Sequence, residues 1–197
     1  RFKARDGLEI PLHITRPAGK GPWPTVVLVH GGPNVRGGHW AWDADSQFLA
    51  SRGYLVLEPE FRGSTGYGSR LFRAGWKQWG LKSQDDINDA LAWAVARGDA
   101  DAGRACLAGA SYGGYLTSVL LGTEHPFKAL LIHAAVYNMY SQMAADFAVH
   151  STRFGNFWDN PEIYKSISPH YAAGNFNTPT LVIHGQLDYR VPVGQGF

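Results

Sequence analysis

Short apolar runs alternate along this chain with amphipathic stretches. Residues 25–30 form a β-branched run without polar alternation, which is typical of a strand covered on both faces. Residues 8–14 alternate between apolar and polar side chains, and Pro11 among them predicts a half-exposed strand at the edge of a sheet. Four more runs resemble the first and predict buried strands: residues 54–57, 105–108, 129–132 and 180–183.

Amphipathic helices are expected between these strands. Ser83 stands three residues before Asp86, which predicts an N-cap, and an apolar stripe at helical spacing follows over residues 87–95. Residues 115–121 are compatible with a second helix. Buried strands that alternate with helices predict an α/β protein whose mainly parallel sheet carries helices on both faces. Sites in such sheets form at the carboxyl ends of the strands.

Composition narrows the class of protein. The chain has 197 residues, of which 45% are hydrophobic, and this is enough for one folded domain with a sizeable core. The formal net charge of +2, without a Lys/Arg cluster, gives no reason to expect nucleic acid or a membrane surface as a partner. The longest apolar run, residues 129–136, is far shorter than the ~18 residues that a membrane helix needs.

Cofactors and metals are not expected either. Cys106 is the single cysteine, which excludes an internal disulfide and a zinc site made of cysteines alone. The histidines lack the spacing of metal ligands, and no phosphate-binding or dinucleotide-binding glycine motif occurs. The chain begins with Arg1 instead of Met, so we expect a piece of a longer protein, and the cellular compartment stays open.

The chemistry is concentrated first in residues 109–114, Gly-Ala-Ser-Tyr-Gly-Gly, directly after a predicted strand. In a G-x-S-x-G motif the serine occupies a strained turn between strand and helix, and the glycines let neighbouring backbone approach. Ser111 is therefore the candidate nucleophile, and the amide of Tyr112 at the helix N-terminus is a candidate oxyanion donor. A glycine-rich turn with a passive serine is the alternative.

A second motif, His30-Gly31-Gly32-Pro33, follows the first buried run. Serine hydrolases of this architecture place their second oxyanion donor here, and because Pro33 has no amide hydrogen, Gly32 is the candidate. An ordinary turn at the strand exit is the alternative. We expect His30 to be a structural hydrogen-bonding group and not a catalytic base.

A third candidate, Asp188, follows the last buried run. An acid in this place, after the serine in chain order, holds a histidine in its useful tautomer in such hydrolases. The rival acids Asp146 and Asp159 have no preceding strand. An N-cap or a salt bridge to Arg190 is the alternative role for Asp188.

Together these motifs resemble the prolyl oligopeptidase family of serine peptidases. The resemblance rests on residues 30–33, 62–68, 109–114 and 184–192, in the family's order and over nearly the whole chain. The stretch Phe154-Gly155-Asn156-Phe157-Trp158 is most similar to the dipeptidyl peptidase 5 and acylaminoacyl peptidase branch.

The resemblance implies an α/β-hydrolase peptidase domain over residues 1–197, preceded in the family by a β-propeller that this chain lacks. It implies that Ser111 is the acylated nucleophile and Asp188 the triad acid. The oxyanion hole would then consist of the backbone N–H groups of Tyr112 and Gly32.

The same resemblance implies a substrate pocket. Val136, Met139 and Val191 would border an apolar pocket for the residue before the cleaved bond, and short peptides would be the substrates. The glycine-rich loop 62–68 would be structural support. Whether the full-length protein forms a homo-oligomer stays open.

The chain departs from the family pattern in one respect. The family's catalytic histidine follows the acid, whereas all eight histidines here precede Asp188. We therefore expect residues 1–197 to lack the last strand–helix unit of the fold, which leaves residues 180–183 as an exposed edge. Without a base the serine hydroxyl is weakly nucleophilic, so the 197-residue chain by itself is expected to be inactive or nearly so.

Three functions remain in competition. The leading hypothesis is peptide-bond hydrolysis through Ser111. A carboxylesterase uses the same triad, although esterases usually carry a third glycine where this chain has Pro33. A catalytically inactive hydrolase fold that serves as a binding module is the third.

Overall fold

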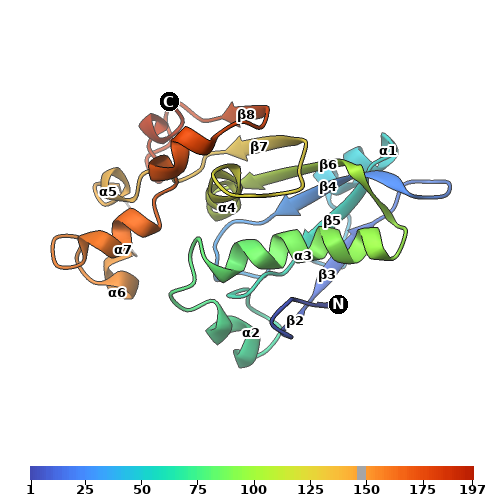
Figure 1. The fold of residues 1–197 in the computed structure, drawn as a ribbon, viewed down its shortest axis with the longest axis horizontal. Helices are drawn as coiled ribbons and strands as arrows, with labels where there is room; N and C mark the ends of the chain where they lie inside the picture. Colours follow the sequence, from blue (N-terminus) through green and yellow to red (C-terminus); the bar gives the residue numbers. More distant parts are fainter. Residues whose placement is uncertain (146–149) are drawn as a thin grey trace.

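A six-stranded sheet forms the centre of the protein, in the order β3-β5-β4-β6-β7-β8. The computed structural model describes residues 1–145 and 150–197 (Figure 1). β3 pairs antiparallel with β5, and the other neighbours run parallel. A separate hairpin pairs β1 (Phe2–Lys3) with β2 (Glu9–Ile10). The strands of the main sheet are β3 (Leu12–Thr15), β4 (Trp23–Val29), β5 (Leu55–Pro59), β6 (Ala100–Ala110), β7 (Ala129–His133) and β8 (Thr180–Ile183).

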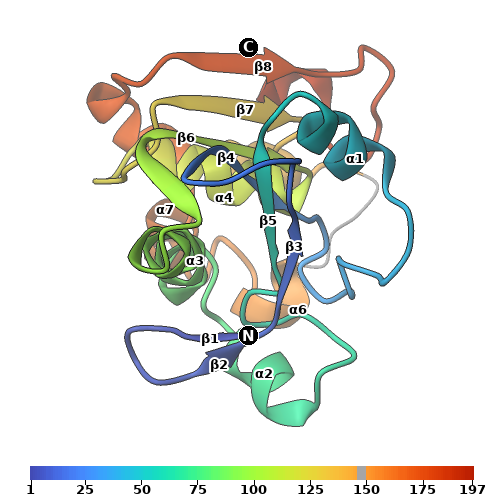
Figure 2. The ribbon, with the colours of Figure 1, turned by 90° about the vertical axis from the view of Figure 1, so that its right-hand side faces the viewer.

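Helices cover both faces of this sheet. α3 (Lys82–Ala96) and α4 (Tyr112–Leu121) lie on one face, and α1 (Ala44–Ser51) lies on the other (Figures 1 and 2). The predicted α/β architecture, a mainly parallel sheet with helices on both faces, is confirmed. The core forms where the first face meets α3 and α4, because the β-branched and leucine-rich strands have no polar face to turn toward water. Its fully buried side chains include Val27, Leu55, Leu57, Ile87, Leu116 and Leu120.

The connection between β7 and β8 is the longest excursion from the sheet. It contains α5 (Met139–Gln142), α6 (His150–Phe154), α7 (Pro161–Ser166) and the 3-10 helix η1 (Pro169–Asn175). Figure 1 shows α5, α6 and α7 beyond the carboxyl ends of the parallel strands. The two remaining elements are α2 (Ser69–Ala74) after β5 and η2 (Val193–Gln195) after β8. The connection between β7 and β8 therefore lies near the carboxyl ends of the parallel strands, where a functional site in this class of sheet is expected.

The two edges of the sheet differ in how they are protected. β3 is one edge, as predicted, but Pro11 divides the predicted strand 8–14 into β2, which belongs to the separate hairpin, and β3. β8 is the other edge, and Leu181 and Ile183 on it are 57% and 44% exposed. The exposure of these side chains shows that the expectation of residues 180–183 as a strand covered on both faces is wrong. The expected exposed edge is confirmed, because β8 ends the order of the sheet and pairs, among the described residues, with β7.

The N-terminus of α3 also differs from the prediction. The N-cap is Leu81, not Ser83, and the Ser83 hydroxyl donates to the carbonyl oxygen of Gln78 at 3.4 Å. The carboxylate of Asp86, which would complete a capping box, instead accepts hydrogen bonds from Arg62. A long-range ion pair thus replaced the local capping interaction that the spacing suggested.

Candidate active site

Ser111 occupies the junction between β6 and α4. Its backbone has φ 55° and ψ −118°, a conformation that non-glycine residues rarely adopt and that costs about 1–3 kcal/mol. Two hydrogen bonds of the Ser111 backbone hold the turn: its N–H donates to His133 O at 2.9 Å, and its carbonyl accepts from Tyr115 N at 2.9 Å. The strained turn places Ser111 at the carboxyl end of the sheet.

The glycines around Ser111 are required by close backbone packing. A Cβ on Gly109 would collide with the carbonyl of Gly113, and a Cβ on Gly113 would collide with the carbonyl oxygen of Val29. A Cβ on Gly114 would lie 2.8 Å from the Cβ of Ala135. α4 therefore approaches β4, β6 and the residues after β7 more closely than any side chain would allow.

A cavity of about 310 Å³ opens beside Ser111. Its lining residues come from the loop after β4, the start of α4, the segment after β7 and the loop after β8, among other segments. Val136 and Val191 line it, whereas Met139 does not: the Met139 side chain is fully buried in the core. The complete lining is Gly32, Val35, Trp79, Ser111, Tyr112, Tyr115, Val136, Gln142, Arg190 and Val191.

Several of these lining residues escaped the sequence analysis. Val35, Trp79, Tyr115 and Gln142 belong to no motif. Val35 and Tyr115 are near neighbours of Gly32 and Ser111 in the chain, whereas the packing of distant segments brings Trp79 and Gln142 to the cavity. The Trp79 and Tyr112 rings meet edge to face with their centroids 4.8 Å apart. Gln142 donates from Nε2 to the carbonyl oxygen of Arg190 at 2.6 Å, which ties α5 to the loop after β8.

The two candidate oxyanion donors border the same cavity as Ser111. Tyr112 is the first residue of α4, where backbone N–H groups have no partner within the helix. Gly32 has φ +121°, and the neighbouring Gly31 is so near that a Cβ on it would lie 3.2 Å from Ser111 Cβ. Backbone N–H groups in such a place can stabilise negative charge that develops beside the serine.

The loop after β8 is folded around Asp188. Its Oδ1 accepts hydrogen bonds from the backbone N–H groups of Arg190 at 3.0 Å and Val191 at 2.9 Å. Its Oδ2 accepts no hydrogen bond within the described residues and lies 3.9 Å from His184 Nε2. The Asp188 side chain thus shapes the loop that carries Arg190 and Val191 to the cavity, and one carboxylate oxygen is left for a further donor.

The rival acids do not lie at this site. Asp159 accepts a hydrogen bond from Asn156 Nδ2 at 3.1 Å on an exposed loop between α6 and α7. Asp146 lies outside the described residues.

His30 is a structural residue, as predicted. Its ring Nε2 lies 2.9 Å from Ser64 Oγ, and its Nδ1 lies 2.6 Å from the carbonyl oxygen of Gly31. The ring stacks on Phe61 with centroids 4.3 Å apart, and burial lowers the pKa of the imidazole. Both ring nitrogens are therefore engaged away from Ser111.

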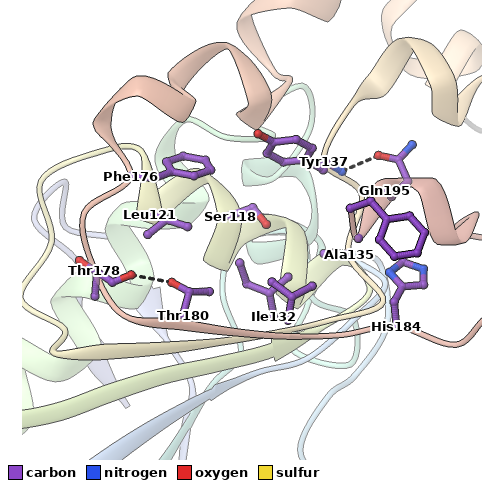
Figure 3. Close-up of a pocket in the computed structure, with 13 residues that line it drawn as sticks. Ser118, Leu121, Ile132, Ala135, Tyr137, Phe176, Thr178, Thr180, His184 and Gln195 are labelled. Atoms are coloured by element: carbon purple, nitrogen blue, oxygen red, sulfur yellow. Dashed lines mark hydrogen bonds between the residues drawn. The ribbon is translucent and has the colours of Figure 1, made fainter.

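His184 is engaged in a different cavity, of about 420 Å³, between α4, β7, β8, η1 and η2 (Figure 3). Figure 3 shows His184 at the end of this cavity near Gln195 and Ala135. His184 Nε2 donates to the carbonyl oxygen of Val191 at 2.7 Å. Among the histidines whose side chains the structure describes, none forms a hydrogen bond with the Ser111 hydroxyl.

The loop 62–68 packs against the loop after β4, where Ser64 Oγ lies 2.9 Å from His30 Nε2 and the carbonyl oxygen of Gly63 accepts from Asn34 Nδ2 at 2.8 Å. The Arg62 guanidinium is 3% exposed and binds both carboxylate oxygens of Asp86, with Nη2 at 2.6 Å from Oδ1. It also donates to Asp6 Oδ2 at 2.9 Å, and these contacts hold the pKa of Asp6 down at about 2. The structural role expected for this loop is thereby confirmed for Arg62.

Metal sites and membrane spans are two further features that residues 1–145 and 150–197 could contain. These residues include no group of three or more His, Cys, Asp or Glu side chains placed to share a metal ion. No helix in the same ranges has the length and apolar character that crossing a bilayer requires. Cys106 is half-buried in β6, and burial raises the pKa of its thiol.

Comparison with known proteins places these features in context. A model of the prolyl oligopeptidase family matches residues 40–197. The chain is 34% identical over 187 residues to the probable dipeptidyl-peptidase 5 of Emericella nidulans. That alignment covers 88% of this chain and 25% of the relative, so the chain spans about a quarter of the relative's length.

Solved structures give the same picture. The acylaminoacyl peptidase of Pyrococcus horikoshii superposes with a TM-score of 0.91 and 30% identity, over 100% of this chain and 33% of that one. A puromycin-hydrolyzing peptidase of Mycobacterium tuberculosis superposes with a TM-score of 0.91 and 28% identity, over 99% of this chain and 31% of that one. The chain is thus similar to one part of several larger peptidases.

Proposed function

The chain belongs to the prolyl oligopeptidase family of serine peptidases, and we propose that it cleaves short peptides by acyl transfer to Ser111. One observation carries the proposal. The strained serine, the two candidate oxyanion amides and the loop shaped by Asp188 all border one cavity of about 310 Å³. The finer assignment, a dipeptidyl or acylaminoacyl peptidase that releases short fragments from the amino ends of peptides, is drawn from the relatives.

The proposed reaction follows from this geometry. Ser111 Oγ attacks the scissile carbonyl carbon while a base takes the hydroxyl proton, and the carbonyl oxygen becomes an oxyanion. The N–H groups of Gly32 and Tyr112 donate to that oxygen. Collapse of the tetrahedral intermediate expels the amine, which takes the proton, and leaves an ester on Ser111. Water then repeats the attack and releases the acid.

The base is proposed to be a histidine that these 197 residues do not contain. The histidines whose side chains are described make no hydrogen bond with Ser111, and Asp188 Oδ2 retains an open acceptor position. We propose that residues 1–197 form most of a peptidase domain, which a further strand–helix unit bearing this histidine completes. A β-propeller of the whole protein would restrict the substrates to short peptides.

The wall of the cavity determines which type of substrate residue is preferred before the cleaved bond. Val136 and Val191 line it together with the rings of Trp79 and Tyr115, so an apolar side chain of the substrate would be buried there. Met139 would act from the core behind this wall, through packing and not through contact with substrate.

The proposal is tested on the intact protein with a fluorophosphonate and with two substrates, a peptide anilide and a short acyl ester. We expect one stoichiometric adduct and anilide hydrolysis, both lost in Ser111→Ala. The matched control is Ser118→Ala on the same helix, where the hydroxyl donates to the carbonyl of Gly114 at 3.0 Å. Hydrolysis of the ester alone would favour a carboxylesterase, and inertness toward both substrates would favour a binding module.

The origin of the base is tested separately. The polypeptide of these 197 residues is expected to hydrolyse the anilide about 10⁶-fold more slowly than the intact protein, since loss of the histidine of a serine-protease triad has that order of effect. If the 197-residue polypeptide and the intact protein hydrolysed the anilide at equal rates, the base could not be a histidine outside these residues. One of the histidines within them would then be the base.

A further inference from the structure

Arg153 is a cation with an unusual environment close to the proposed active site. It lies half-buried on α6, with its guanidinium 5.3 Å from the centroid of the Trp79 ring and 6.0 Å from that of Trp76. Among the described residues, no carboxylate forms an ion pair with it. Burial lowers the pKa of Arg153, so its position opposes the charge of the guanidinium.

The polar partner of Arg153 is the side chain of Asn34. Arg153 Nη2 donates to Asn34 Oδ1, and Asn34 Nδ2 donates to the carbonyl oxygen of Gly63 at 2.8 Å. These two partners determine which end of the amide is oxygen and which is nitrogen. Asn34 therefore connects α6 to the loop after β5, two segments that lie far apart in the sequence.

Asn34 is in turn packed against Gly32. A Cβ on Gly32 would lie 2.9 Å from the backbone nitrogen of Asn34 and 3.0 Å from Val35 Cγ2. Gly63, whose carbonyl oxygen accepts from Asn34, is tightly packed against Gly75: a Cβ on Gly75 would lie 2.5 Å from Gly63 Cα. A displacement of Asn34 would therefore move the backbone that carries the Gly32 amide.

We infer that Arg153 is a positioning residue, which acts through Asn34 to hold the Gly32 amide where it meets the oxyanion. The inference rests on the proposed function, in which that amide donates to the oxyanion. It assigns a positioning role to α6, none of whose described side chains lines the cavity. The competing role, direct binding of an anionic group of the substrate by Arg153, makes different predictions.

The difference lies in the step that each role affects. A displaced oxyanion donor weakens the transition state and leaves the bound substrate almost unaffected, so kcat falls and KM does not rise. A lost contact with the substrate itself raises KM. The two roles are therefore separated by steady-state kinetics on a peptide anilide.

The first experiment measures kcat and KM of the intact protein and of Arg153→Met, Asn34→Ala and the double variant. Removal of an oxyanion donor typically costs about 10²–10³ in kcat, so its displacement is expected to cost about 10- to 100-fold, with KM within about twofold. The double variant is expected to lose no more than either single one, because both remove the same connection. Arg153→Lys is expected to recover part of the loss, since an ammonium still donates to Asn34 Oδ1.

Arg97→Met is the matched control. Arg97 also stacks on an indole ring, with its guanidinium 4.8 Å from the centroid of Trp93, but it follows α3 and borders no part of the cavity. Its replacement is expected to leave kcat and KM unchanged.

The second experiment compares a peptide aldehyde, which forms a hemiacetal with Ser111, and the corresponding peptide alcohol, which does not. In Arg153→Met the inhibition constant of the aldehyde is expected to rise by the same factor by which kcat falls, while that of the alcohol stays unchanged. Equal weakening of both inhibitors, a rise in KM alone, or unchanged kinetics would each overturn the inference.

Two controls keep the outcome interpretable. If Arg153→Met fails to fold, Asn34→Ala removes the connection with a smaller change and carries the same expectations. If Ser111→Ala binds the aldehyde as tightly as the unaltered protein, the proposed function itself is wrong. If inhibition by the aldehyde depends on Ser111 but the kcat and KM of Arg153→Met equal those of the unaltered protein, the positioning role of Arg153 is rejected and the proposed function stands.

Discussion

At the scale of single residues, the turn at Ser111 depends on neighbouring glycines, which have no Cβ atom. Ser111 keeps a positive φ because its backbone bonds to His133 and Tyr115 compensate the strain. Gly113 adds nothing to the chemistry, yet its lack of a Cβ lets α4 lie directly against the carbonyl of Val29. The same approach aligns the N-terminus of α4 with the cavity.

Gly113→Ala is therefore expected to destabilise the protein by about 3 kcal/mol, at the upper end of the usual cost of overpacking, because backbone cannot move aside as a side chain does. The free energy of unfolding in urea measures this. Gly174→Ala is the matched control, since a Cβ on Gly174 meets nothing within 4 Å. A loss no larger than that of the control would show that the helix can shift without cost.

At the scale of elements, Arg62 connects three parts of the fold. It follows β5, and its guanidinium reaches Asp86 on α3 and Asp6 in the turn between β1 and β2. Asp86 is fully buried and Arg62 nearly so, and such a pair is stable only when its hydrogen bonds are satisfied, as they are here. The two-stranded hairpin is thus tied to the main sheet by charge as well as by its apolar side chains.

This connection predicts a pH dependence. The hydrogen bond from Arg62 lowers the pKa of Asp6 from 3.8 to about 2, so the unfolded chain binds this proton more tightly than the folded protein does. The contribution of Asp6 to stability is therefore present above pH about 4 and is lost as the pH falls toward 2. We expect the difference in unfolding free energy between the unaltered protein and Asp6→Asn to be constant from pH 7 to 5 and to shrink below pH 4. A difference that persists at pH 2 would contradict this assignment.

At the scale of the whole molecule, the sheet is protected unevenly. Its β3 edge directly follows Pro11, whereas the β8 edge presents Leu181, Val182 and Ile183 at 57%, 46% and 44% exposure. An edge strand whose outer backbone groups are unpaired and whose apolar side chains are exposed is a template for pairing with another chain.

The polypeptide of these 197 residues is accordingly expected to self-associate through β8. Sedimentation velocity should give a mass above 21.6 kDa that rises with concentration, and Leu181→Lys should reduce it. Phe48→Lys on α1 is the control, because Phe48 is 58% exposed but lies away from the strand edge. Association that Leu181→Lys leaves unchanged would place the contact elsewhere.

Local patterns in the sequence were enough to predict the parallel strands, the turn between strand and helix at Ser111, and the family. Each of these depends on neighbours in the chain: β-branched runs favour strands, and Gly-x-Ser-x-Gly requires one backbone geometry around Ser111. Gly32 and Asp188 could be proposed for the same reason, since each directly follows a predicted strand whose end lies at the site.

Only the tertiary structure decided what meets these residues. Trp79 and Tyr115 reach the cavity, Met139 turns into the core, and Asp86 binds Arg62 instead of closing a capping box. The order of the strands likewise has no signal in any single run. Contacts between segments far apart in the chain depend on how whole elements pack, and a side chain's local sequence carries no record of its distant partner.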